Sequence, residues 1–178
     1  MKSVCVFCGS NPGQDPVYRT AAAQVGRRLA ERGLRLVYGG GSVGLMGVVA
    51  DAALAAGGQA VGVLPLSMSE TEVAHRGLTE LRIVPGMHER KALMNELSDA
   101  FLTLPGGFGT LDELFEAVTW KQLGIHAKPI GLLNVEGYFD PLIAFVDRAA
   151  GAGFVSARNR GLIRVDSDPD RLIAALAG

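Results

Sequence analysis

The stretch Leu102–Val118, LTLPGGFGTLDELFEAV, joins a short apolar run to a helical pattern through a proline and three glycines. The apolar run is typical of a buried strand, and the residues after the glycines have the apolar spacing of a helix. A strand, a tight loop and a helix form the repeating unit of a parallel sheet, because parallel strands need a helical crossover between them. The stretch therefore predicts one unit of an α/β fold.

The same alternation runs along the rest of the chain. We predict strands at residues 2–7, 34–38, 60–64, 79–84, 100–104, 128–133 and 162–165. We predict helices at 16–32, 45–56, 87–98, 110–123, 138–151 and 169–177, and an irregular segment with one short helical turn at 65–77. This order predicts a doubly wound, Rossmann-like, mostly parallel sheet flanked by helices on both faces, in a single domain over residues 1–178.

Composition limits the class of protein. The chain has 178 residues, of which 48% are hydrophobic and 20% charged, as in a globular domain with one substantial core. The net charge is −1 without a long basic run, so we expect small anions and not nucleic acid as partners. No window resembles a membrane span, and the first apolar run is too short for a signal peptide. We expect a cytoplasmic protein.

Two cysteines, Cys5 and Cys8, have the C-x-x-C spacing of redox and zinc sites. Both fall inside a predicted strand, whereas a redox pair normally opens a helix. A closed zinc site needs two more ligands, and the histidines are scattered singly along the chain. We therefore interpret both as buried strand thiols and expect neither a metal nor a cofactor.

Four predicted strands end in unusual loops. These loops read CGSNPG at residues 8–13, GGGSVG at 39–44, PGMHERK at 85–91 and PGGFGT at 105–110. Ligands of a doubly wound sheet bind outside the carboxyl ends of its strands. Glycines allow close backbone approach, and helix N-termini present unpaired N–H groups to anions. The loops therefore predict a phosphate site at this edge.

The GGGSVG loop fits G-x-G-x-x-G only formally. A dinucleotide fold needs this motif after the first strand, with an acid about twenty residues further on to hold the ribose. Here the motif follows the second strand, and no acid stands in the strand at 60–64. Neither glycine loop continues with G-K-[ST], so the ATP-binding P-loop is absent as well.

The charged residues beside these loops allow two interpretations. Thr110 and Glu113 have the spacing of a capping box, in which the threonine caps the helix and the glutamate bonds back to it. Glu113 equally suits a catalytic carboxylate beside a phosphate. Arg90 and Lys91 lie in the first predicted helical turn, where the helix dipole disfavours cations. An anionic ligand explains this placement better than a solvated face does.

The segment PGGFGTLDE at 105–113 resembles the P-G-G-x-G-T-x-x-E signature of the LONELY GUY (LOG) family. Members of that family are cytokinin riboside 5′-monophosphate phosphoribohydrolases, and they were long labelled lysine decarboxylases. MHERK at 87–91 resembles the second motif of the family. CVFCGS, YGGGSVGLMG and TWKQLGIHAKPIGLLNVEGYFDPL are similar to it too, so that the likeness covers roughly Val4 to Arg160.

This resemblance implies hydrolysis of the N-glycosidic bond of an N6-modified adenosine 5′-monophosphate, which releases a free base and ribose 5-phosphate. It implies that Arg90 and Glu113 form the catalytic pair. Other positions implied at the nucleotide are Gly106, Gly107, Gly109 and Thr110 in the phosphate-binding turn, Gly40 and Gly41 in the same cleft, Met87 and Lys91 near the nucleotide, and Ser10 as a further contact. It also implies a homodimer with the site near the subunit interface.

Two rival functions follow from the same residues. A pyridoxal phosphate decarboxylase needs a Schiff-base lysine and an acid partner for the cofactor ring, and Lys91 is the only lysine near the loops. A non-catalytic nucleotide- or phosphate-binding protein would use every glycine loop. Only the pair of Arg90 and Glu113 then favours an enzyme.

Overall fold

The computed structural model describes residues 1–69 and 74–178, which form a seven-stranded sheet. Every strand pairs in parallel with its neighbours, in the order β4-β3-β2-β1-β5-β6-β7. The strands are β1 (Ser3–Phe7), β2 (Arg35–Tyr38), β3 (Ala60–Pro65), β4 (Glu80–Val84), β5 (Ala100–Thr103), β6 (Ile130–Leu133) and β7 (Ile163–Asp166). The predicted doubly wound α/β fold is confirmed.

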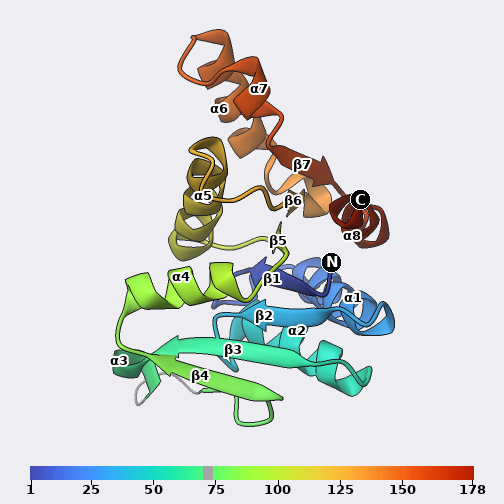
Figure 1. Cartoon of the computed structure of the whole chain (residues 1–178). Helices are drawn as coiled ribbons and strands as arrows, with labels where there is room; N and C mark the ends of the chain where they lie inside the picture. The colour runs from blue at the N-terminus through green and yellow to red at the C-terminus, as the bar shows by residue number, and fades with distance from the viewer. Residues whose placement is uncertain (70–73) are drawn as a thin grey trace.

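Helices cover both faces of this sheet. They are α1 (Pro16–Glu31), α2 (Gly44–Ala55), α3 (Leu66–Ser69), α4 (Met87–Glu96), α5 (Phe108–Gln122), α6 (Asp140–Gly151), α7 (Ala157–Arg160) and α8 (Pro169–Ala177), with a 3-10 turn at Val135–Gly137. In Figure 1, α1 and α8 lie together on one side of the strands, and α4 and α5 lie on the other. The predicted irregular segment contains α3, and the part at 70–73 lies outside the described residues.

Side chains of the central strands alternate between two cores. Val4, Val6 and Cys8 pack with α1, α2 and α8, whereas Cys5 and Phe7 pack with α4 and α5. The period of two residues in a strand sends Cys5 and Cys8 to opposite faces of the sheet. Both are free buried thiols, as predicted, and the C-x-x-C spacing does not bring them together.

Helix α7 was not predicted from the sequence, and the predicted start of α6 was wrong. A 3-10 turn precedes α6, and Glu136 within it has a φ of 48°. The chain thus turns once more before the helix begins at Asp140 and not at Tyr138. This turn brings Tyr138 to the edge of the sheet where the glycine loops lie.

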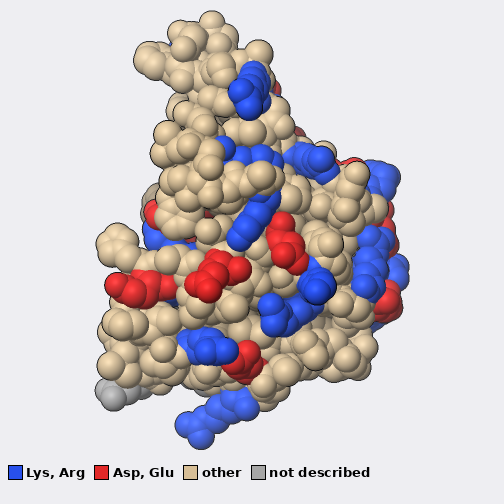
Figure 2. Space-filling model, in the orientation of Figure 1, with Lys and Arg blue, Asp and Glu red and all other residues tan. Residues whose placement is uncertain are grey.

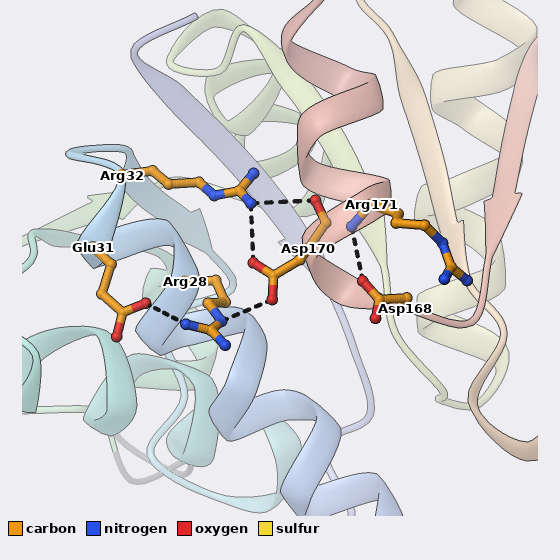
Figure 3. Close-up of polar contacts among 6 residues, drawn as sticks. All are labelled: Arg28, Glu31, Arg32, Asp168, Asp170 and Arg171. Carbon is orange, nitrogen blue, oxygen red and sulfur yellow. Dashed lines mark hydrogen bonds and ion pairs between the residues drawn. The ribbon is translucent and has the colours of Figure 1, made fainter.

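The closing helix α8 is fixed to α1 by charged side chains, shown in Figure 3. Asp170 accepts from Arg28 at 3.0 Å and from Arg32 at 2.9 Å. Asp168 caps α8, since its carboxylate accepts from the backbone N–H of Arg171 at 2.8 Å. Exposed pairs of this kind contribute little to stability, so they orient the helix more than they stabilise it. The buried residues Leu172, Ile173 and Leu176 hold it against the sheet.

Charges of both signs are interspersed on the face shown in Figure 2. No basic stripe gathers there, in agreement with the net charge of −1. Within residues 1–69 and 74–178, no helix has both the length and the apolar character needed to cross a membrane.

Candidate active site

A cavity of about 610 Å³ opens at the carboxyl ends of β1 and β5. The crossovers run in opposite directions from these two strands, so the cavity lies at the switch point of the sheet, where doubly wound folds bind ligands. The loops after both strands line it, together with α4, α5 and the turn before α6. Predicted site residues on its wall are Ser10, Met87, Arg90, Gly106, Gly107, Gly109, Thr110 and Glu113.

One end of the cavity is formed by the N-terminus of α5. The helix begins at Phe108, and Gly107 is its N-cap without any side-chain cap. The capping-box interpretation of Thr110 and Glu113 was therefore wrong, because Thr110 is already the third helical residue. The first helical hydrogen bond is donated by Leu111 to Gly107, so the N–H groups before it have no partner within the helix. Such a helix end binds anions.

Gly106 allows the two central loops to meet at this end. A Cβ atom on Gly106 would lie 2.1 Å from Thr110 Oγ1 and 2.8 Å from the backbone nitrogen of Gly9. The Gly9 N–H donates to the carbonyl of Pro105 at 3.0 Å. The hydroxyl of Tyr138 donates to the Gly106 carbonyl at 2.7 Å, so the turn before α6 also holds this loop in place.

Arg90 projects from α4 beneath the cavity, and it is 8% exposed. Its Nε donates to the carbonyl of Val63 at 3.1 Å and its Nη2 to the carbonyl of Gly39 at 3.2 Å. Its Nη1 donates to the sulfur of Met87 at 3.4 Å and lies 3.8 Å from Glu113 Oε1. The planar guanidinium is therefore held rigidly, with one edge directed at the carboxylate.

Glu113 projects from the second turn of α5 and lines the same cavity. Its side chain is 13% exposed. Burial raises the pKa of this carboxyl to about 7, and the positive charge of Arg90 opposes the rise. The separation of 3.8 Å is too long for a direct hydrogen bond, so the carboxylate keeps acceptor sites for a ligand or water. A carboxyl group with a pKa near 7 beside a fixed cation is typical of a catalytic site.

The packing of Arg90 against Gly39 leads to a first prediction. A Cβ atom at position 39 would lie 1.9 Å from Nη2 of Arg90, so Gly39→Ala must displace the guanidinium. We expect a loss of catalytic activity of about 10²-fold, because a displacement of about 1 Å at a catalytic group has this effect. Gly151→Ala is the control, since a Cβ there meets nothing within 4 Å. Equal activities of the two variants would contradict the assigned position of Arg90.

Three predicted site residues lie away from the cavity. Gly40 packs against Leu64 and Leu81, and Gly41 forms an isolated bridge with Ala74. Neither glycine is among the described residues that line the cavity, and the backbone N–H of His75 donates to the Gly40 carbonyl at 3.1 Å. Their place in the cleft stays a prediction. Lys91 also points elsewhere, to two carboxylates of α5.

Other cavity residues belong to the loops predicted at this edge: Cys8, Gly9, Asn11, Pro12, Gly13, Pro105 and Phe108. The predictions did not include Tyr18, Leu45, Met46, Met68 and Tyr138, which line the cavity as well. Tyr18 and Tyr138 meet edge to face with their ring centroids 5.6 Å apart. The signal available for Tyr138 was its place just after β6, because loops at the carboxyl ends of strands converge. The three methionines Met46, Met68 and Met87 give the cavity an adaptable apolar wall.

Known proteins resemble this chain closely. A family model described as "possible lysine decarboxylase" matches residues 46–176. The cytokinin riboside 5′-monophosphate phosphoribohydrolase LOG of Oryza sativa subsp. japonica is 51% identical over 162 residues, or 91% of this chain and 67% of the relative. The cytokinin riboside 5′-monophosphate phosphoribohydrolase of Rhodococcoides fascians is 51% identical over 176 residues, or 98% of this chain and 89% of the relative. This chain belongs to the LOG family.

The fold of this LOG protein is also found in more distant structures. The molybdenum cofactor binding protein of Rippkaea orientalis has a TM-score of 0.75 at 21% identity, and the match covers 99% of this chain and 96% of that one. The molybdenum cofactor carrier protein of Chlamydomonas reinhardtii has the same TM-score at 22% identity, with 99% and 96% of the two chains covered. At this level of identity, the likeness shows a shared fold.

The decarboxylase description of the family model does not fit the cavity of this LOG protein. The reaction needs a lysine that can form a Schiff base with pyridoxal phosphate. No lysine occurs among the described residues that line the cavity. The nearest candidate, Lys91, is 14% exposed and paired with Asp112 and Glu116, whose charges favour its protonated, non-nucleophilic form.

Proposed function

We propose that this LOG protein hydrolyses the N-glycosidic bond of an N6-modified adenosine 5′-monophosphate and releases the free base and ribose 5-phosphate. The relatives bearing this activity in their names are about half identical over nearly the whole chain. The observation that carries the proposal is the pairing of Arg90 with Glu113 beside the N-terminus of α5. An anion site and a catalytic carboxylate thus share one cavity.

The cavity orders the parts of such a substrate along α5. The 5′-phosphate is placed at the N–H groups of Gly107, Phe108 and Gly109, where the helix dipole favours an anion. Glu113 follows Gly109 by about one helical turn, an axial distance of about 6 Å. A phosphorylated ribose spans this interval, so its anomeric carbon reaches the carboxylate. The base then extends toward the methionine wall.

The chemistry follows from this placement. Cleavage of the glycosidic bond develops positive oxocarbenium character on the ribose, and an ionised Glu113 stabilises this charge. The carboxylate either attacks the anomeric carbon itself or activates a water molecule that does so. Arg90 is a poor proton donor because its pKa lies above roughly 12. We therefore assign it to orienting substrate and Glu113 by charge-assisted hydrogen bonds.

A non-catalytic nucleotide-binding protein would also use the glycine loops and the helix end. It would have no need for a buried carboxyl group with a raised pKa in the cavity, and a carboxylate near the phosphate repels it. This group therefore favours turnover over binding alone.

The pKa of Glu113 leads to a second prediction. Since this pKa is raised to about 7 and the ionised form is the active one, kcat/KM is expected to fall as pH decreases through 7. Below that pH, the decrease should approach tenfold per unit, and above it the rate should level off. The measurement is base release between pH 5 and 9 at low substrate concentration. A plateau that continues down to pH 5 would show that Glu113 is not the group that must be ionised.

Direct assay of base release tests the proposed function. The purified protein is incubated with AMP, N6-isopentenyl-AMP, GMP and CMP, and free base is separated by chromatography. We expect release from the adenine nucleotides and much slower release from adenosine, which lacks the phosphate. If the nucleotides bind and no base appears, the protein is a binding protein and the hydrolase assignment is wrong.

We also propose a homodimer with the cavity near the subunit interface. Large apolar side chains are exposed along α5 and the segments after it: Phe108 is 94% exposed, Leu123 66%, Phe145 63% and Phe154 86%. Exposed apolar surface of this kind is typical of an association site. Phe108 also lines the cavity, which supports an interface beside it. Light scattering of the purified protein gives the mass of the assembly.

A further inference from the structure

Lys91 follows Arg90 on α4, yet its ammonium lies between carboxylates and not in the substrate cavity. The Nζ atom is 2.8 Å from Glu116 Oε2 and 3.1 Å from Asp112 Oδ2. The lysine side chain is 14% exposed and that of Glu116 is 24% exposed, so the pair is shielded from solvent. Both carboxylates belong to α5, the helix that carries Glu113. Lys91 therefore joins α4 to α5 next to the candidate catalytic group.

Glu113 separates the substrate cavity from a second, much smaller one. This second cavity has a volume of about 20 Å³ and is lined by Lys91, Glu113 and Glu116 with the aromatic residues Phe7, Phe101 and Trp120. The aromatic wall keeps the surroundings of these charges poor in water, which lengthens the range of their interaction. Glu113 thus meets Arg90 from the substrate cavity and Lys91 from the second one.

Three carboxyl groups, at positions 112, 113 and 116, crowd one turn of α5. The groups that act on the pKa of Glu113 are Arg90 and Lys91 from α4, which lower it, and Asp112 and Glu116 from α5, which raise it. The thiols of Cys5 in β1 and of Cys8 just after it stay neutral, because burial raises the pKa of each. Lys91 is therefore the cation that balances both neighbouring carboxylates, and Arg90 is left to interact with Glu113.

We propose that Lys91 is a positioning residue that pairs with Asp112 and Glu116, so that the charges of these neighbours oppose the ionisation of Glu113 less and its carboxyl faces the substrate cavity. Lys91 does this without touching the substrate. The inference rests on the proposed function for the reaction that Glu113 serves. It replaces the sequence-based expectation that Lys91 binds the nucleotide.

The pH profile of kcat/KM for base release tests this role with three variants. Lys91→Met removes the charge and keeps a side chain of similar length. The pH at which kcat/KM begins to fall should rise by about one unit. The plateau of kcat/KM at high pH should stay within a few-fold of the wild type. Lys91→Arg keeps the charge and should restore the wild-type profile to within about 0.3 unit. Glu116→Gln removes an opposing charge and should move the decrease downward.

Opposite shifts in Lys91→Met and Glu116→Gln are the decisive result, because neither misfolding nor a lost substrate contact produces them. If Lys91 binds the nucleotide, Lys91→Met raises KM at every pH and leaves the position of the decrease unchanged, which would overturn the proposal. Lys121→Met is the matched control, since Lys121 lies on the same helix α5 and lines neither cavity. Its profile should coincide with that of the wild type.

A titration that needs no turnover separates this proposal from the proposed function. Carbon-13 NMR of glutamate carboxyls, with the Glu113 signal assigned by its loss in Glu113→Gln, gives the pKa in wild type, Lys91→Met and Glu116→Gln. If the wild type releases no base, the hydrolase assignment fails, and the NMR shifts still decide the role of Lys91. Unchanged Glu113 titration in both variants would overturn it. If Lys91→Met does not fold, the pKa of Glu113 is compared in Glu116→Gln, where it should fall, and in Lys91→Arg, where it should stay at the wild-type value.

Discussion

Glu113→Gln is expected to lower kcat for base release by about 10³-fold, within the 10²–10⁴ range that a positioned acid–base group contributes. Glutamine keeps the size of the side chain and loses the negative charge that the oxocarbenium-like transition state requires. Nucleotide binding should remain within a few-fold of the wild type, because the proposed phosphate site lies at the N-terminus of α5, about one turn away. Steady-state kinetics at pH 8 and calorimetric titration with AMP measure the two quantities.

Glu89→Gln is the control for this change. Glu89 is an exposed carboxylate in the first turn of α4 and is not among the residues that line the cavity. Its replacement should leave both kcat and nucleotide binding unchanged. A Glu113→Gln variant with a lower melting temperature and full specific activity would assign Glu113 a structural role and refute the catalytic one.

Arg90→Met is expected to lower kcat/KM at pH 7 by at least about 10²-fold and to destabilise the protein by about 3 kcal/mol. The guanidinium satisfies the buried carbonyls of Gly39 and Val63, and its loss leaves both without these donors. The same change removes the positive charge that lowers the pKa of Glu113. The rate decrease at low pH should therefore move to higher pH as well.

Arg90→Lys separates charge from geometry at this position. Lysine keeps a positive charge, but it has a single ammonium group in place of a planar guanidinium. It therefore cannot bond to the carbonyls of Gly39 and Val63 and face Glu113 at the same time. We expect a loss of activity close to that of Arg90→Met, with a smaller displacement of the pH profile. Thermal unfolding and pH-dependent kinetics provide the measurements. Activity within threefold of wild type in Arg90→Met would show that the guanidinium takes no part in the reaction.

The order of strands and helices could be predicted from the sequence because local spacing carries that information. Short apolar runs separated by helical patterns and glycine loops permit only a parallel sheet with crossovers. The starts of α1 and α8 are equally local, since Asp15 and Asp168 cap them and a proline stands at the first helical position of each. The start of α5 was misplaced because Thr110 and Glu113 fit a capping pattern, whereas the backbone becomes helical at Phe108.

Only the part of the site that follows from the sheet topology could be predicted. Parallel strands place their carboxyl ends at one edge, so the loops at Ser10 and Gly106 had to converge, and the likeness to the LOG family added the roles of Arg90 and Glu113. Gly40 and Gly41 share that edge and still miss the cavity. Their surroundings depend on tertiary contacts with Leu64, Leu81 and Ala74, which local sequence does not encode.

Sequence by itself determined which residues this protein brings to the carboxyl edge of its sheet, and the family to which it belongs. The tertiary structure alone decided what each of them faces there. Arg90 and Lys91 are adjacent cations, but successive residues of a helix point about 100° apart, so one meets Glu113 and the other meets Asp112 and Glu116. Burial between α4, α5 and β1 then raises the pKa of Glu113 to about 7, and burial is a property of packing.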